Sequence, residues 1–427
     1  MYLTGMKDFY AKYFKYIFFA FALFLPLNEK VSTLLIVLLV ILTIVGLSFN
    51  NLSLNKEKNA VLLLLPILFA VYGISLFFVS EHIEFKYLEN KLSLLAFPII
   101  LAVRQDVDRI GILRFFVFGC ILAYLICLGN SFFNAIVLES GNFRFNPLNN
   151  DSRTFFEAIM YEGNVFFGKY FSFIYHQTYF AVYLSFSFLI LNVYKRMFCK
   201  WQILLGNIIF PLGVIQTMSM AGFGTLLIVV FALLFLNPYV HRLKMILFGI
   251  FLAALIAGIS IHPRIQKLVR DLRMNETLIK PNAMDGIMLR VLSWDASIEI
   301  IKNHPITGVG VGDSQKALNE VYKDKKYIHP LERNLNAHNQ YLQIMIETGI
   351  FGLLTLVLIL TALFYRAATI SGPLKIIIFS FVIMLAFNFL FESILSRYIG
   401  ISFFAFFSCL LSNMPQKTTD FEKAPNK

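Results

Sequence analysis

Long apolar runs, separated by short polar stretches, follow one another along almost the whole chain. A helix needs about 20 mostly apolar residues to cross a bilayer. The pattern therefore predicts an all-α polytopic membrane protein with about twelve transmembrane helices. The predicted spans are 13–28, 31–49, 59–79, 88–103, 110–133, 177–194, 201–218, 221–236, 243–261, 340–365, 373–391 and 395–412.

Two polar interruptions are much longer than turns, and with twelve spans both face the same, outer side. The sequence therefore predicts a large, partly helical periplasmic loop between helices 9 and 10, and a shorter outer loop at about 134–176. The predicted regions are 1–261 with the first nine helices, 262–339 as the large loop, 340–412 with the last three helices, and 413–427 as a cytoplasmic tail.

The large loop contains a stretch with helical spacing. This spacing predicts a helix from Arg290 to Asn303. It places four apolar side chains on one face of that helix, namely those of Val291, Trp294, Ile298 and Ile301.

Composition agrees with a lipid environment, because 58% of the residues are hydrophobic and only 15% are charged. A soluble domain carries roughly 25% charged residues. The low charge therefore excludes a soluble enzyme of this size, and the high hydrophobicity excludes a disordered chain.

The net charge of +12 would fit a nucleic-acid-binding protein, but the distribution of the charges does not. The basic residues form short clusters in alternate connections, as the positive-inside rule requires. We therefore expect no nucleic-acid partner and place both termini in the cytoplasm. The clusters are Lys7, Lys12 and Lys15; Lys56 and Lys58; Arg104, Arg109 and Arg114; Lys195, Arg196 and Lys200; Arg242 and Lys244; Arg366 and Lys375; and Lys417, Lys423 and Lys427. Lys30, Lys86, Lys91 and Arg397 are assigned to the opposite side.

Neither a metal site nor a disulfide framework is indicated. The four cysteines, which are Cys120, Cys127, Cys199 and Cys409, form no Cys-x-x-Cys pair and lie in or beside apolar runs. The Asp-x-Asp at 106–108 falls on the predicted cytoplasmic side and is interpreted as a solvated loop.

The densest chemical signal lies where the large loop enters the tenth span, in the sequence Ala-His-Asn-Gln-Tyr-Leu-Gln from 337 to 343. Asn339, Gln343 and Glu347 recur every four residues and form a polar stripe on an apolar helix. His338 stands beside this stripe. It could anchor the helix at the membrane surface, or it could act as a base in a wet pocket, because the pKa of an imidazole suits proton transfer near neutral pH.

A second signal is the sequence His-Pro-Ile-Thr-Gly-Val-Gly-Val-Gly from 304 to 312. Alternating glycines also occur in nucleotide-binding loops, but here no βαβ unit surrounds them. We interpret Gly308 and Gly310 as allowing a tight backbone path after the predicted helix.

Together these motifs resemble the O-antigen ligase and polymerase superfamily. The elements are Arg290 with Trp294, His304-Pro305 with Gly308 and Gly310, His338-Asn339 with Leu342, and Glu347 with Gly349 and Gly352. The segment from His176 to Tyr179, and the segment from Phe391 through Glu392 and Arg397 to Gly400, are similar to Bacteroidota-type members.

The resemblance implies a metal-independent glycosyltransferase without a cofactor in the bacterial inner membrane. Such enzymes move a glycan from an undecaprenyl-diphosphate carrier to an acceptor at the periplasmic face. The first hypothesis is an enzyme that ligates O-antigen to lipid A core. The alternatives are an O-antigen or exopolysaccharide repeat polymerase and a protein O-oligosaccharyltransferase.

The resemblance also assigns roles to residues of this chain. His338 becomes the catalytic base, and Arg290 and Arg397 become ligands of the donor diphosphate, because the guanidinium fork suits phosphate. Supporting roles fall to Asn339, Tyr341, Trp294, His176, Glu392, Gly308 and Gly310.

One family feature is missing. Members often carry a Ser-Arg pair before the eighth span, whereas this chain reads Thr-Met-Ser-Met-Ala-Gly from 217 to 222. The donor contact ascribed to that arginine must therefore come from elsewhere or be absent.

A secondary transporter is the competing class, since twelve spans are also typical of carriers. Carriers, however, place ionisable residues near the midplane and show repeated halves, and neither feature is present here.

Overall fold

The computed structural model describes residues 2–48, 59–103, 108–139, 142–148, 163–235 and 286–415, together with positions 249, 253, 281 and 282. Helices lie at every predicted span except the ninth, 243–261, which is almost wholly outside the described residues. These helices are α1 (Tyr2–Phe24), α2 (Glu29–Ser48), α3 (Ala60–Phe78), α5 (Ser93–Val103), α6 (Arg109–Ala135), α9 (Gln177–Val193), α10 (Lys200–Gln216), α11 (Met220–Phe235), α17 (Gln340–Thr369), α18 (Pro373–Phe389) and α19 (Tyr398–Ser412).

Within the described residues, four helices are long and apolar enough to cross a membrane, namely α2, α3, α6 and α17. Several shorter apolar helices, among them α9, α18 and α19, accompany them. The chain is therefore a multi-pass, predominantly helical membrane protein. The total of twelve spans stays a prediction.

The remaining elements are short or lie in the predicted loops. They are α4 (Lys86–Glu89), α8 (Gly168–Phe171), η1 (Lys195–Met197), α14 (Gly286–Asn303), α15 (Ser314–Asp324), α16 (Ile328–Glu332), η2 (Ile394–Ser396), and the strands β1 (Ile136–Glu139) and β2 (Asn142–Phe145). The two strands pair as an antiparallel hairpin, which the all-α prediction did not include.

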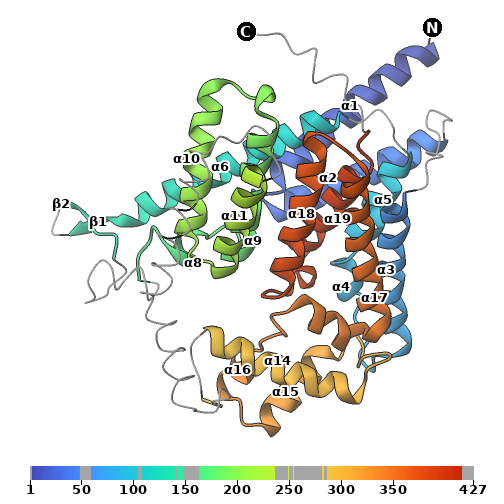
Figure 1. Ribbon diagram of the computed structural model, residues 1–427, viewed down its shortest axis with the longest axis vertical. Coiled ribbons are helices and arrows are strands. Elements are labelled where there is room, and N and C mark those ends of the chain that lie inside the picture. The colour runs from blue at the N-terminus through green and yellow to red at the C-terminus, as the bar shows by residue number, and fades with distance from the viewer. Residues whose placement is uncertain are drawn as a thin grey trace.

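The helices form a bundle, and α14, α15 and α16 lie as a separate layer at one end of it (Figure 1). Helix α19 is the centre of the bundle, since every residue from Ile399 to Ser412 is buried. A helix that is apolar all round fits such a position. Helix α2, by contrast, exposes a row of aliphatic side chains that includes Leu34, Ile41 and Ile44.

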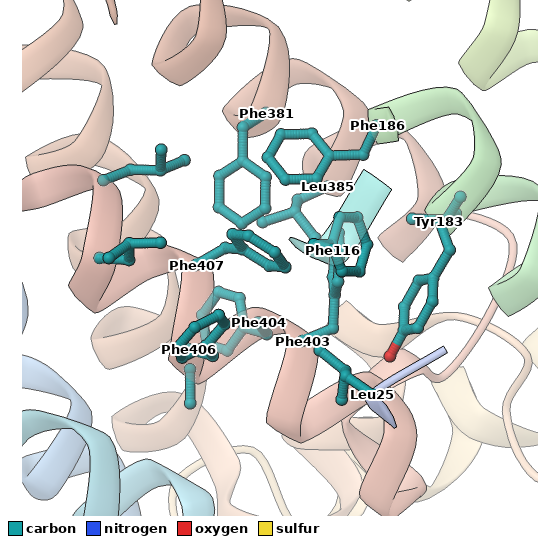
Figure 2. Close-up of a cluster of buried hydrophobic side chains, with 14 of the residues drawn as sticks. Leu25, Phe116, Tyr183, Phe186, Phe381, Leu385, Phe403, Phe404, Phe406 and Phe407 are labelled. Carbon is teal, nitrogen blue, oxygen red and sulfur yellow. The ribbon is translucent and has the colours of Figure 1, made fainter. Parts of the chain in front are cut away.

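Phenylalanine side chains from several helices fill the centre of the bundle (Figure 2). The Phe407 ring of α19 lies 4.8 Å from the Phe116 ring of α6 and 4.8 Å from the Phe186 ring of α9. Lipid is as apolar as these side chains, so helices associate there mainly through close packing rather than through the hydrophobic effect. Interlocking rings supply that packing, which accounts for the abundance of phenylalanine in this chain.

The layer at the end of the bundle has a small core of its own. Leu292, Ala296 and Ile300 of α14 pack with Leu318 and Tyr322 of α15. The prediction of a helix at 290–303 is confirmed. On the face with the large apolar residues, Val291, Trp294 and Ile301 are half-buried, and Ile298 is 44% exposed. The buried face includes Ser293, Ala296 and Ser297, whose small side chains let the neighbouring elements approach closely.

Helix α17 is kinked at Gly349, and the kink joins two of the sequence motifs. Gly349 has φ 63° and ψ −155°, a conformation that is essentially restricted to glycine. The loop after α14 crosses there, with the Val309 N–H donating to the Ile346 carbonyl at 2.8 Å and the Ile350 N–H donating to the Pro305 carbonyl at 3.1 Å. Gly308, at φ +69°, is also needed for this approach, because a Cβ on it would lie 2.4 Å from the Ile346 oxygen. The tight path inferred from the glycines is confirmed.

Replacing Gly349 should therefore destabilise the protein. A Cβ at this position would lie 2.0 Å from the Ile306 carbonyl oxygen. We expect Gly349→Ala to cost at least about 1–3 kcal/mol from backbone strain alone. Thermal unfolding of the purified protein in detergent would measure the loss. Gly73→Ala in α3 is the matched control, because its Cβ would meet nothing within 4 Å. Equal unfolding temperatures for the two variants would contradict the argument.

A charged contact fastens the layer to the bundle. The Asp313 carboxylate accepts from the Glu81 N–H at 2.6 Å and pairs with the His82 imidazole at 2.5 Å. Partial burial raises the pKa of Asp313, but the bonds from His82 and Glu81 outweigh it, so the pKa lies below its usual value.

This contact should make part of the stability acid-sensitive. A carboxyl whose pKa is lowered by folding contributes stability above its unfolded pKa, and this contribution disappears as the pH falls through the folded pKa. We expect Asp313→Asn to lower the unfolding temperature at pH 7. The difference from the parent should shrink as the pH falls below about 4. Asp324→Asn, at the exposed end of α15, is the control. A difference that stays constant down to pH 3 would refute this role.

Candidate functional site

The start of α17 is fixed by the side chain of Asn339. Its Oδ1 accepts from the backbone N–H groups of Tyr341 and Leu342 at 2.9 and 3.2 Å. Asparagine in this position caps a helix by satisfying its first free N–H groups. The predicted polar stripe is present and buried, and Gln343 donates to Glu347 at 2.8 Å.

His338 immediately precedes this cap and adopts an uncommon backbone conformation, with φ 45°. Its N–H donates to Asn336 Oδ1 at 3.0 Å, which holds the bend. Non-glycine residues in this region cost free energy and are enriched at functional sites. His338 Nδ1 lies 3.6 Å from Glu392 Oε1, although the two residues are far apart in sequence.

Glu392 belongs to the segment 391–397 between α18 and α19, hereafter the 391–397 turn. Side chains from four different parts of the chain form hydrogen bonds with the backbone of this turn. Arg290 Nε donates to the Phe391 carbonyl at 3.2 Å, the Tyr179 hydroxyl donates to the Ser393 carbonyl at 3.3 Å, and Lys91 Nζ donates to the Leu395 carbonyl at 3.2 Å. Gln340 Oε1 accepts from the Leu395 N–H at 2.6 Å.

The electrostatics of the turn favour an ionised Glu392. Burial raises the pKa of this carboxyl, but the neighbouring His338, together with His176 and Arg290, lowers it by more, so the pKa is below its ordinary value. Glu392 Oε2 has no hydrogen-bond partner among the described residues. A buried carboxylate therefore faces His338, and its second oxygen, Oε2, can still accept a hydrogen bond.

His176 caps α9 close to the same group of charges. Desolvation by the surrounding protein lowers the pKa of its imidazole. Glu392 raises this pKa, whereas Arg397, His338 and Arg290 lower it. Four residues that the sequence singled out therefore lie near His176. They are Arg290 of α14, His338 before α17, and Glu392 and Arg397 of the 391–397 turn.

The predicted cations differ in their surroundings. Arg290 is half-buried, and besides the Phe391 bond its Nη1 donates to the Gly286 carbonyl at 3.3 Å. Arg397 is exposed at the start of α19. Within the described structure, Glu392 pairs with His338 and forms no ion pair with Arg397.

Three of the predicted supporting residues make their contacts apart from Glu392. The Tyr341 hydroxyl donates to the Ala386 carbonyl at 3.1 Å and so ties α17 to α18. Trp294 Nε1 is buried and has no partner within the described part of the chain. Gly310 approaches Ser80, where a Cβ would lie 2.4 Å from the serine hydroxyl. Gly310 therefore shapes the backbone path rather than the group around Glu392.

Sequence reasoning missed Lys91, Tyr179 and Gln340 as residues of this site. Lys91 was assigned to an outer connection, but it is only 4% exposed and its ammonium lies 4.1 Å from the Tyr72 ring centre. An ionisable residue at the edge of an apolar run was the available signal. The segment that lacks the family arginine is bonded to α9 instead, through a contact of 3.2 Å between the Ser219 and Thr178 hydroxyls.

Within the described residues, no group of three or more His, Cys, Asp or Glu side chains is arranged to hold a metal ion. The groups gathered at the 391–397 turn are the imidazoles of His338 and His176, the buried carboxylate of Glu392, the guanidinium groups of Arg290 and Arg397, and the Lys91 ammonium.

Comparison with known proteins agrees with the motifs. Residues 203–357 match the family model described as O-antigen ligase. Over this part, the chain is similar to the O-antigen ligase family. The matched region contains Arg290, His338 and the glycines of the α17 kink, so the resemblance seen in the sequence is confirmed. The match supports the interpretation that this protein is a membrane-bound glycan transferase similar to the ligases and polymerases of this superfamily. No curated protein matches the chain.

Proposed function

We propose that this protein transfers a glycan from an undecaprenyl-diphosphate carrier to an acceptor hydroxyl at the periplasmic face of the bacterial inner membrane. Lipid A core is the proposed acceptor, which would make the reaction O-antigen ligation. The observation that carries the proposal is the contact of 3.6 Å between His338 and Glu392, near Arg290. His338 and Arg290 lie in the region that matches the O-antigen ligase model.

The proposed roles follow from the geometry. Glu392 faces Nδ1 of His338, which leaves Nε2 as the nitrogen that accepts a proton from the acceptor hydroxyl. The acceptor oxygen forms a bond to the anomeric carbon, and the bond from that carbon to the diphosphate breaks. The diphosphate leaves with the electron pair, and the proton stays on His338, where the Glu392 carboxylate stabilises the imidazolium.

Arg290 is the proposed ligand of the departing diphosphate. Two of its N–H groups are used for the Phe391 and Gly286 carbonyls, so Nη2 is the end of the fork assigned to the phosphate oxygens. A fixed cation stabilises the charge that develops on a leaving group. Arg397 is the second candidate, and it is the residue that could compensate for the arginine missing near Ala221.

The function is tested by deleting the gene and separating the surface polysaccharide on a gel. Loss of all long chains from lipid A core, restored by the parent gene, is the result expected of a ligase. Chains with a single repeat would instead identify a polymerase, and normal polysaccharide with a lost protein glycan would identify a protein glycosylase. Normal surface glycans of every kind would reject the proposal.

The proposed orientation places both termini in the cytoplasm and α14–α16 in the periplasm. A cysteine at Lys323, an exposed position of α15, tests this when it replaces the lysine in a Cys199→Ser background. We expect a membrane-impermeant maleimide to label this cysteine in cells whose inner membrane is intact. Labelling only after the inner membrane is broken would reverse the orientation.

A further inference from the structure

The β1–β2 hairpin has two unlike faces. In its register Ile136 lies opposite Phe145 and Leu138 opposite Phe143, and because side chains alternate along a strand these four share one face. They are 53%, 60%, 65% and 79% exposed, respectively. Arg144, which pairs with Val137, lies on the other face.

Exposure of such an apolar face to water is unfavourable, so the face is expected to contact either protein or lipid. An isolated two-stranded hairpin is marginally stable in water at best. The hairpin lies at the outer edge of the molecule, beyond the end of α6 and away from the centre of the bundle (Figure 1). In the structure, these four side chains have most of their surface free of protein.

The apolar face continues an apolar stripe of α6, one of the helices long enough to cross a membrane. The exposed side chains of this stripe recur at helical spacing and are Leu122, Leu125, Ile126 and Phe132. The Phe132 ring at its end lies 6.5 Å from the Phe145 ring of the hairpin and 5.0 Å from the Phe166 ring. The lipid-facing surface of α6 therefore runs without a break into the hairpin.

We propose that this hairpin lies in the interface of the lipid bilayer, with Ile136, Leu138, Phe143 and Phe145 inserted between the lipids. Aromatic residues are enriched at this level of the membrane, and a basic residue on the opposite face suits lipid phosphates. The predicted outer loop that begins near residue 134 thus starts as a membrane-bound element. This proposal does not depend on glycan transfer.

Fluorescence quenching of the full-length protein in phosphatidylcholine nanodiscs tests the proposal. Single cysteines replace Phe143 and Leu138 on the apolar face and Arg144 on the other, in a Cys199→Ser background, because the other three cysteines are buried. Each is labelled with bimane. The quenchers are a lipid with a nitroxide on its acyl chain, below the headgroup, and iodide in the water.

We expect the labels at 143 and 138 to lose most of their fluorescence to the lipid nitroxide and little to iodide. The label at 144 should show the reverse. Iodide quenching of both faces would mean that the hairpin stands in water, and protection from both quenchers would mean that protein covers it. Either result overturns the proposal. Two positions on the apolar face keep the test decisive if one variant fails to fold.

Discussion

His338→Ala is expected to reduce glycan transfer by about 10²–10⁴-fold, the usual contribution of a general base. The variant should remain folded, because the His338 side chain is still partly exposed and makes no hydrogen bond within the described structure that holds two helices together. The measurement is single-turnover transfer with purified protein, lipid-linked donor and acceptor. Gel filtration in detergent would verify the fold.

Two further variants make the result specific. His329→Ala removes a histidine of α16 that pairs with its neighbour Glu332, and transfer should be unchanged. Glu392→Gln keeps the shape of the side chain but removes the charge that faces His338. It should slow transfer less than His338→Ala, because the base is kept and only the charge that stabilises the imidazolium is lost. Near-normal transfer by folded His338→Ala would remove the proposed base.

The sequence predicted the helices well because apolar length is a local property. Each run of apolar residues within the described chain became a helix where it was expected. Position within the bundle depends on contacts between distant segments, and no local pattern separates the central α19 from the peripheral α2. Both are mostly apolar, yet α19 is buried from Ile399 to Ser412 and α2 exposes a row of aliphatic side chains.

The packing of α14 shows the same limit. The helical spacing placed the apolar residues at 291, 294, 298 and 301 on one face, but it did not show which face packs against other elements. The structure buries the face with Ser293, Ala296 and Ser297. Next to other helices, small side chains can be better contacts than large ones.

Parts of the candidate site could be predicted from motifs, and parts could not. His338, Asn339 and the glycines lie in short recurring patterns. The pairing of His338 with Glu392 and the four side chains that hold the 391–397 turn join segments that are far apart in the chain. Lys91 shows the difficulty, because its hydrogen bond to Leu395 spans 304 positions and no spacing in the sequence reveals it.

Arg290→Ala should impair transfer strongly, by about 10- to 100-fold at low donor concentration, the loss expected from a hydrogen bond to a charged group. Arg290→Lys should fall between the parent and Arg290→Ala, because lysine keeps the charge but has no planar fork. Initial rates measured over a range of donor concentrations would establish the order. Arg333→Ala, an exposed arginine of the same layer, is the control.

The dependence of the rate on donor concentration separates the proposed diphosphate contact of Arg290 from its observed bond to the Phe391 carbonyl. If its main task is to hold the diphosphate, saturating donor should restore much of the rate, since the loss is one of binding. If its main task is the bond to the Phe391 carbonyl, the rate should stay low at every donor concentration, because the turn that carries Glu392 would be displaced. Parent-like transfer by Arg290→Ala, with failure of Arg397→Ala, would move the phosphate contact to the start of α19.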